Sequence, residues 1–168
     1  MRVVVVGLFL GVCTGEVAAQ PVYSSAEGKY SIKFPNTPKV TENTTKSAVG
    51  ELTVTIATYA HSDGSTFMVS YTDFPAAATN PENHAKLFVG VRDGVSKDGK
   101  VVGKEIVLTA GFEKWPGREF TVEKGKQRIR FRVFIRNQRV YQLAVIGKPD
   151  FVTGREANTF FDSLDLTK

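Results

Sequence analysis

Short runs in which hydrophobic and polar residues alternate make up most of the chain after residue 20. Leu52, Val54 and Ile56 alternate with threonine and alanine, and an apolar run at 67–71 follows the turn at 61–64. A repeat of two places the apolar side chains on one face of an extended strand. These two runs predict an antiparallel hairpin, and the run at 30–34, which Pro35 ends, predicts a further strand.

Helical spacing replaces the alternation at two places. Asn80 and Pro81 are typical of a helix start, because Asn caps free backbone N–H groups and Pro suits the first turn. Apolar residues then recur every three or four positions, which predicts a helix over about 80–97 that stops near Gly99. A last helix is expected after Pro149, with Phe160 and Phe161 on its inner side, followed by a short extended tail.

The second half of the chain repeats the order of strands before a helix. Residues 101–108, 118–123, 126–136 and 139–147 are all rich in β-branched or aromatic side chains. Strands in runs, with a helix after each run, predict an α+β fold with a largely antiparallel sheet. No linker divides residues 20–168, so one domain is expected there.

One hairpin allows a prediction of register. If Lys124 and Gly125 form a two-residue turn, Glu123 lies opposite Lys126 and Glu119 lies opposite Arg130. Opposite charges then meet on one face of the hairpin and apolar side chains meet on the other. A shift of one residue would break both agreements.

With this order of elements, the chain resembles the PsbP-like superfamily. Its members include the extrinsic photosystem II protein, a eukaryotic Ran-binding import factor and exported bacterial proteins. The resemblance rests on residues 30–35, 115–119, 132–143 and 160–166. It implies an α/β/α sandwich with a central, mainly antiparallel sheet and two principal helices, and members that act by binding partners instead of by catalysis. No segment resembles the metal or photosystem docking parts of the plant protein.

The first residues look like an export signal. Arg2 precedes an apolar run from Val3 to Val12, and small residues lead to a predicted cut between Ala19 and Gln20. Residues 1–19 are therefore expected to be a signal peptide and 20–168 the exported domain, periplasmic or extracellular. The run is too short to span a bilayer, so no membrane anchor is expected. Lipidation of Cys13, the single cysteine, is the alternative.

Positive charge is concentrated in one part of the chain. The 168 residues carry a net charge of +5, whereas residues 97–139 alone hold 12 basic and 5 acidic side chains. Lys126, Arg128, Arg130 and Arg132 fall on even positions, so they share one face of a strand and form a row of roughly 20 Å. This row is the predicted binding site for a polyanion. The alternative is that these side chains are solvated and cover apolar surface with their stems.

Other chemistry is not indicated. His61 and His84 have no neighbours at metal-ligand spacing, no nucleophile elbow occurs, and no aromatic series accompanies the basic residues. No cofactor, metal or nucleic acid is therefore expected. The predicted function is a non-catalytic binding module for an unknown protein or acidic polymer of the cell envelope. The alternative is a hydrolase whose cleft joins residues distant in sequence, for example Asp63 and Asp73.

Overall fold

The computed structural model describes residues 21–47 and 49–166, so the predicted signal peptide at 1–19 lies outside the described residues. Within these ranges the chain forms a two-stranded sheet, a seven-stranded sheet and four α-helices. The elements are β1 (Val22–Ser25), β2 (Tyr30–Lys33), β3 (Lys39–Ser47), β4 (Gly50–Ala60), β5 (Thr66–Asp73), α1 (Ala76–Thr79), the 3-10 helix η1 (Pro81–Asn83), α2 (His84–Ser96), β6 (Lys100–Ala110), β7 (Trp115–Lys124), β8 (Gln127–Arg136), β9 (Arg139–Gly147), α3 (Pro149–Thr153) and α4 (Arg155–Asp162).

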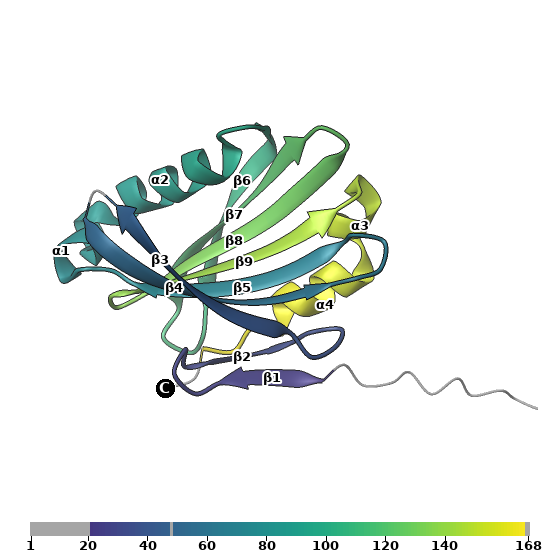
Figure 1. Ribbon diagram of the computed structural model, residues 1–168. Coiled ribbons are helices and arrows are strands. Elements are labelled where there is room, and N and C mark those ends of the chain that lie inside the picture. Colours follow the sequence, from purple (N-terminus) through teal and green to yellow (C-terminus); the bar gives the residue numbers. More distant parts are fainter. Residues whose placement is uncertain (1–20, 48, 167–168) are drawn as a thin grey trace, which may run out of the picture.

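The large sheet joins two meanders. Its strand order is β3-β4-β5-β9-β8-β7-β6, and every neighbouring pair is antiparallel. The first meander is β3-β4-β5 and the second is β6-β7-β8-β9, and α2 lies in the connection between them (Figure 1). The last strands of the two meanders, β5 and β9, pair with each other and join the two into one sheet. The predicted α+β class with an antiparallel sheet is confirmed.

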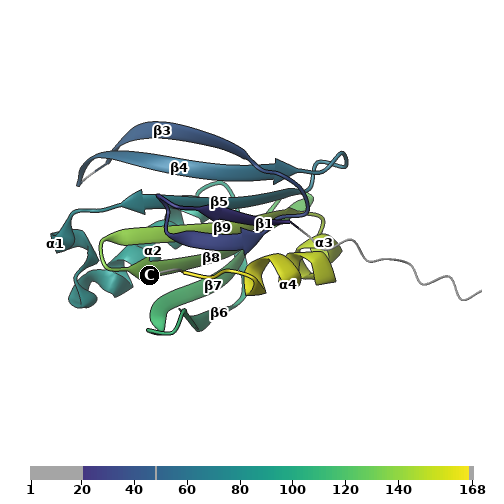
Figure 2. The ribbon, with the colours of Figure 1, turned by 90° about the horizontal axis from the view of Figure 1, so that it is seen from below.

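The two faces of the sheet carry different layers. On one face α2 covers a cluster that includes Phe88, Phe120 and Phe131. On the other face the β1–β2 pair and α4 cover a cluster that includes Phe34 and Phe160 (Figures 1 and 2). Alternate residues of the central strands thus enter different cores, and both faces of the sheet are buried there.

Strand β3 was not expected from the sequence. All nine of its residues are exposed, and most are polar, so no alternation marks it as a strand. It is held by its pairing with β4 along its whole length, from Lys39 opposite Thr58 to Ser47 opposite Gly50. Pairing with a neighbour can therefore fix a strand that buries no apolar face.

The final helix is divided. Gly154 has an extended conformation (ψ 172°) between α3 and α4, and it caps both helices. A Cβ at this position would lie 3.1 Å from the carbonyl oxygen of Asp150 and 3.2 Å from that of Phe151. The break lets α4 change direction after α3 and lie against β2 and the sheet.

The predicted register of the β7–β8 hairpin is wrong by two residues. Lys124 pairs with Gln127, so Gly125 and Lys126 form the turn and Glu119 lies opposite Arg132. Gly125 has a φ of 61°, which suits the first position of a tight hairpin turn. A shift of two residues preserves the face of every side chain, so the predicted separation of charged and apolar residues still holds.

The packing of Gly117 gives a test of this fold. Gly117 pairs with Phe134 across β7 and β8, and an added Cβ would overlap the Phe134 ring and lie 2.9 Å from the carbonyl oxygen of Val133. We expect Gly117→Ala to lower the free energy of unfolding by about 1–3 kcal/mol in urea denaturation. Gly94→Ala is the control, because a Cβ there meets nothing within 4 Å and removal of a helical glycine stabilises by about 1 kcal/mol. Equal effects of the two variants would contradict the packing described.

Candidate functional site

The structure divides the row of four predicted binding residues. Lys126 lies exposed in the β7–β8 turn, and Arg128 is partly exposed, with its guanidinium 3.8 Å from Glu123. The side chains of Arg130 and Arg132 are only 15% and 14% exposed. These two arginines are therefore largely covered, because α4 lies over that part of the sheet.

One buried carboxylate holds both covered arginines. Glu119 accepts hydrogen bonds from Arg130 at 2.9 and 3.1 Å and from Arg132 at 2.5 Å. Each arginine also reaches α4, since Arg130 donates to Asn158 at 2.6 Å and Arg132 donates to Asp162 at 3.1 Å. We call Glu119, Arg130, Arg132, Asn158 and Asp162 the α4 network. Its hydrogen bonds connect β7 and β8 to α4.

The α4 network also has an aromatic component. The two guanidinium groups lie 4.9 and 4.8 Å from the centre of the Phe161 ring. A partly desolvated guanidinium over an aromatic face is attracted by the ring's quadrupole. The two arginines are thus bound by charge and by packing, and both interactions serve to position α4.

Electrostatics in the α4 network favour an ionised carboxylate. Burial by itself would raise the pKa of Glu119, but the hydrogen bonds and charges of Arg130 and Arg132 outweigh it and leave the pKa below its ordinary value. The carboxylate is therefore charged at neutral pH and compensates the two cations beside it.

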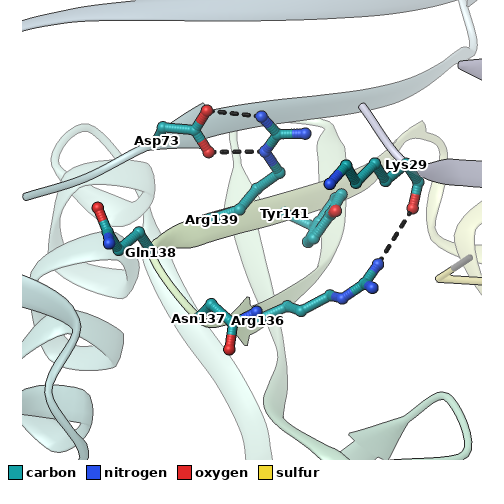
Figure 3. Close-up of a pocket in the computed structure, with 7 residues that line it drawn as sticks. All are labelled: Lys29, Asp73, Arg136, Asn137, Gln138, Arg139 and Tyr141. Carbon is teal, nitrogen blue, oxygen red and sulfur yellow. Dashed lines mark hydrogen bonds and ion pairs between the residues drawn. The ribbon is translucent and has the colours of Figure 1, made fainter. Parts of the chain in front are cut away.

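A small pocket lies at the other end of β8 (Figure 3). Its volume is about 190 Å³, and it is formed where the β1–β2 turn meets the β8–β9 turn and the end of β5. Its lining residues are Lys29, Asp73, Arg136, Asn137, Gln138, Arg139 and Tyr141. We call it the Lys29 pocket.

Three side chains from β8 and β9 build this pocket by holding the β1–β2 turn. Arg139 donates to the carbonyl oxygen of Glu27 at 2.5 Å, Tyr141 to that of Gly28 at 2.8 Å, and Arg136 to that of Lys29 at 3.5 Å. Three consecutive carbonyls of the turn are therefore fixed. The main chain of Lys29, whose φ is 53°, is placed over the β8–β9 turn by these contacts.

The charged groups of the pocket differ in what they already bind. Arg139 forms a two-bonded ion pair with Asp73, at 2.6 and 2.5 Å, and lies 4.7 Å from the Tyr71 ring centre. This hydrogen bonding lowers the pKa of Asp73. Across residues 21–47 and 49–166, the exposed Lys29 ammonium forms no ion pair, although its charge also acts on Asp73. Figure 3 shows this ammonium directed toward the side where Arg139 and Tyr141 lie.

This arrangement suits a small anion. Lys29, Arg136 and Arg139 surround the space with three cations, against the single carboxylate of Asp73. Drug-sized ligands and cofactors occupy pockets of roughly 300–1,000 Å³, which exceeds the 190 Å³ present here. The space can take a carboxylate group or a single acidic side chain.

Only part of this site was predictable from the sequence. Arg136 and Arg139 lie in the basic segment, and Arg139 and Tyr141 lie in a stretch that carries the PsbP-like resemblance. Nothing linked them to Lys29, which is more than 100 residues earlier. A lysine in a short turn has no pattern that predicts which distant strand it will meet.

The carboxylate pair suggested for a hydrolase does not form. Asp63 accepts hydrogen bonds from Ser65 in the turn before β5, whereas Asp73 ends β5 and binds Arg139. The eight-residue strand between them separates the two carboxylates by more than about 20 Å. The expectation that they converge is wrong, because they lie at opposite ends of one strand.

Each of the two histidines lies close to one oxygen atom of another residue. His61 lies 3.3 Å from Glu156 of α4, and His84 lies within hydrogen-bond distance, 2.8 Å, of the carbonyl oxygen of Thr79. In the part of the chain that the structure describes, no three His, Cys, Asp or Glu side chains gather as a metal site would require. None of the helices described there is long and apolar enough to cross a membrane.

Comparisons with known proteins concern the fold. No protein-family model and no curated protein matches the chain. The chain is similar to the solution structure of cyanobacterial PsbP (CyanoP) from Synechocystis sp. PCC 6803, with a TM-score of 0.56 and 14% identity over 94% of this chain and 98% of that one. A protein of unknown function, PA94 from Pseudomonas aeruginosa, matches with a TM-score of 0.40 and 9% identity over 83% of this chain and 90% of its own. The first match supports the PsbP-like fold.

The α4 network predicts unequal effects of two variants, one of an arginine and one of a lysine. We expect Arg132→Ala to lower the free energy of unfolding by about 3 kcal/mol, since it breaks a largely buried ion pair. Lys126→Ala is the matched control and should change it by less than about 0.5 kcal/mol, because its side chain is exposed. Urea denaturation of both variants measures this, and equal stabilities would contradict a structural role for Arg132.

The lowered pKa of Glu119 predicts a pH dependence of stability. A carboxyl group whose pKa is lower in the folded state stabilises the protein above its unfolded pKa, about 4.3. That contribution is lost as the pH falls through the lower folded value. We expect the free energy of unfolding to fall below about pH 4.5, and to fall less steeply in Glu119→Gln. An unchanged pH slope in the variant would refute the assignment.

Proposed function

We propose that the chain is an exported, non-catalytic interaction module that binds an acidic partner in the cell envelope through the Lys29 pocket. The observation that carries this proposal is the pocket itself, in which two fixed arginines and the exposed ammonium of Lys29 surround a space of about 190 Å³. The partner group that fits this space is a carboxylate.

Preorganisation supports binding at this place. Arg139 is held by Asp73 and by the carbonyl oxygen of Glu27, and Arg136 lies 5.9 Å from the Trp115 ring centre. Binding costs less when the groups that contact a ligand are already ordered. A carboxylate that enters would be met by charges that need little rearrangement, with Lys29 closing over it.

The exposed residues of the predicted row add a second contact for longer ligands. Lys126 and Arg128 lie at the opposite end of β8 from Arg136, and ten strand residues extend roughly 30 Å. An acidic polymer of that length would reach both ends of the strand, whereas a short peptide would reach one. We therefore restrict the predicted polyanion contact to Lys126 and Arg128, because α4 covers Arg130 and Arg132.

Export is part of the same proposal. The segment 1–19 has the charge, apolar run and small residues of a signal peptide. The domain that we propose to be exported is similar in fold to CyanoP. We propose that the partner is an envelope protein or acidic polymer that the domain meets after export.

Nuclear magnetic resonance titration tests the Lys29 pocket. A short glutamate-rich peptide added to the ¹⁵N-labelled domain should shift the amide signals of residues 27–29 and 136–141 in a saturable way. We expect Lys29→Gln to weaken binding about fivefold, since it removes one charge from a partly solvated ion pair. Glutamine keeps a long side chain at this position, where φ is 53°.

The matched control is Lys126→Gln, which removes one exposed lysine from the other end of the molecule. The control should bind the short peptide as the original chain does. Equal weakening in the two variants would indicate non-specific attraction to a basic protein, and shifts that avoid residues 27–29 and 136–141 would remove the pocket from the site.

A further inference from the structure

A second, larger concavity lies away from the Lys29 pocket and shares no residue with it. Its volume is about 520 Å³, and it lies between α2, the segment from the end of β5 to α1, and the β3–β4 turn. Its lining residues are Val49, Phe74, Ala78, Asn83, Lys86, Leu87, Gly90 and Val91. We call it the α2 groove. Figure 1 shows the end of β3, the start of β4 and α1 at the same end of the molecule.

The walls of the α2 groove are apolar, and its polar groups lie together. Phe74, Leu87 and Val91 also pack on the α2-side core, so the groove exposes the outer sides of core residues. Its two polar side chains, Asn83 and Lys86, come from the N-terminal end of the helical segment. The groove therefore has an apolar body and one cationic end.

The polar groups differ in their availability. The Asn83 amide already donates to the carbonyl oxygen of Ala77 at 2.8 Å. Lys86 is exposed and forms no ion pair within the described stretches of the chain. An anionic group at this end of the groove would find Lys86 as its partner.

Gly90 keeps the groove open. A Cβ at this position would meet nothing within 4 Å, so packing does not require a glycine here. Glycine within a helix lowers its stability relative to alanine. The same is true of Gly94, one turn later, but Gly94 does not line the groove. The same substitution would therefore fill the groove at Gly90 and leave it open at Gly94.

We propose that the α2 groove binds the alkyl chain of a fatty acid, with Lys86 paired to the carboxylate. The volume lies within the range of small-molecule sites, roughly 300–1,000 Å³. A stable protein interface buries about 800 Å² on each side. The eight residues that line this groove expose a smaller area than that. The combination of an apolar body and a cation at one end matches a linear anionic amphiphile. This binding goes beyond the acidic-partner function and does not depend on it.

The length of the groove limits the chain that it can hold. Asn83 and Val91 are eight residues apart along the helical segment, or about 12 Å. An extended long-chain fatty acid is longer than this, so a medium chain should fill the groove. Each added CH₂ that enters it should tighten binding about threefold to fourfold, until the groove is filled.

Isothermal titration calorimetry with saturated fatty acids of increasing length, each below its micelle concentration, tests the proposal. We expect saturable binding whose dissociation constant falls with each CH₂ and then levels off. Lys86→Met should weaken the binding of the carboxylates and leave that of the corresponding alcohols unchanged. Absence of saturable binding at any chain length would overturn the proposal, and so would an equal loss for acids and alcohols.

Gly90→Leu and Gly94→Leu separate the groove from the rest of the helix. Both replace a helical glycine by leucine where a Cβ has open space, so both variants should fold and melt alike. Gly90→Leu should reduce fatty-acid affinity at least tenfold, and Gly94→Leu should retain it. Retention in Gly90→Leu, or equal loss in both, would overturn the assignment. Binding of a leucine-rich peptide in place of fatty acids, blocked by Gly90→Leu alone, would also overturn it and assign the groove to a protein segment.

Discussion

The ionised carboxylate of Glu119, held between two arginines, is the interaction on which the described arrangement of layers depends. It lies on β7, its partners lie on β8, and those partners continue to Asn158 and Asp162 of α4. A buried charge without partners is costly, so the three ionised groups must stay together. Helix α4 is thereby fixed on the face of the sheet that the arginines occupy.

The position of α4 determines where the C-terminal tail lies. Ser163 accepts a hydrogen bond from the main chain of Lys33, and Asp165 bridges Ser31, so the tail after α4 holds β2. The turn that precedes β2 carries Lys29, and Arg136, Arg139 and Tyr141 fix its carbonyls from the opposite side. The Lys29 pocket is thus assembled by two sets of contacts, and one of them leads back to Glu119.

Most elements could be predicted from the sequence because most of them bury apolar side chains on at least one face. Alternation predicted β4, and a continuous apolar run predicted β5. Richness in β-branched and aromatic residues predicted the four strands of the second half. Helical spacing predicted α2, and Pro149 with the apolar residues after it predicted the final helix. Strand β3 buries nothing, so no pattern marked it. The register of the β7–β8 hairpin was wrong by two residues, yet the faces remained correct, because alternation determines the face of a side chain and a turn determines its partner.

The layer that covers each face could not be predicted from the sequence. Period-two spacing placed Arg130 and Arg132 together, but whether solvent or α4 lies above them depends on contacts about 30 residues away. The same limit applies to the Lys29 pocket and the α2 groove, whose residues come from separate segments. Residues that cluster in sequence, such as the row from Lys126 to Arg132, proved to have three different surroundings.

The exchange of the arginine side-chain protons with solvent tests the central role of the α4 network most directly. In ¹⁵N–¹H spectra at neutral pH, the Nε–H groups of Arg130 and Arg132 should exchange slowly with solvent, since both donate to Glu119. Replacement of Glu119 by glutamine should accelerate that exchange. Exchange as fast as that of an exposed arginine in the unchanged chain would show that the row faces solvent, and would contradict the central role given to the α4 network.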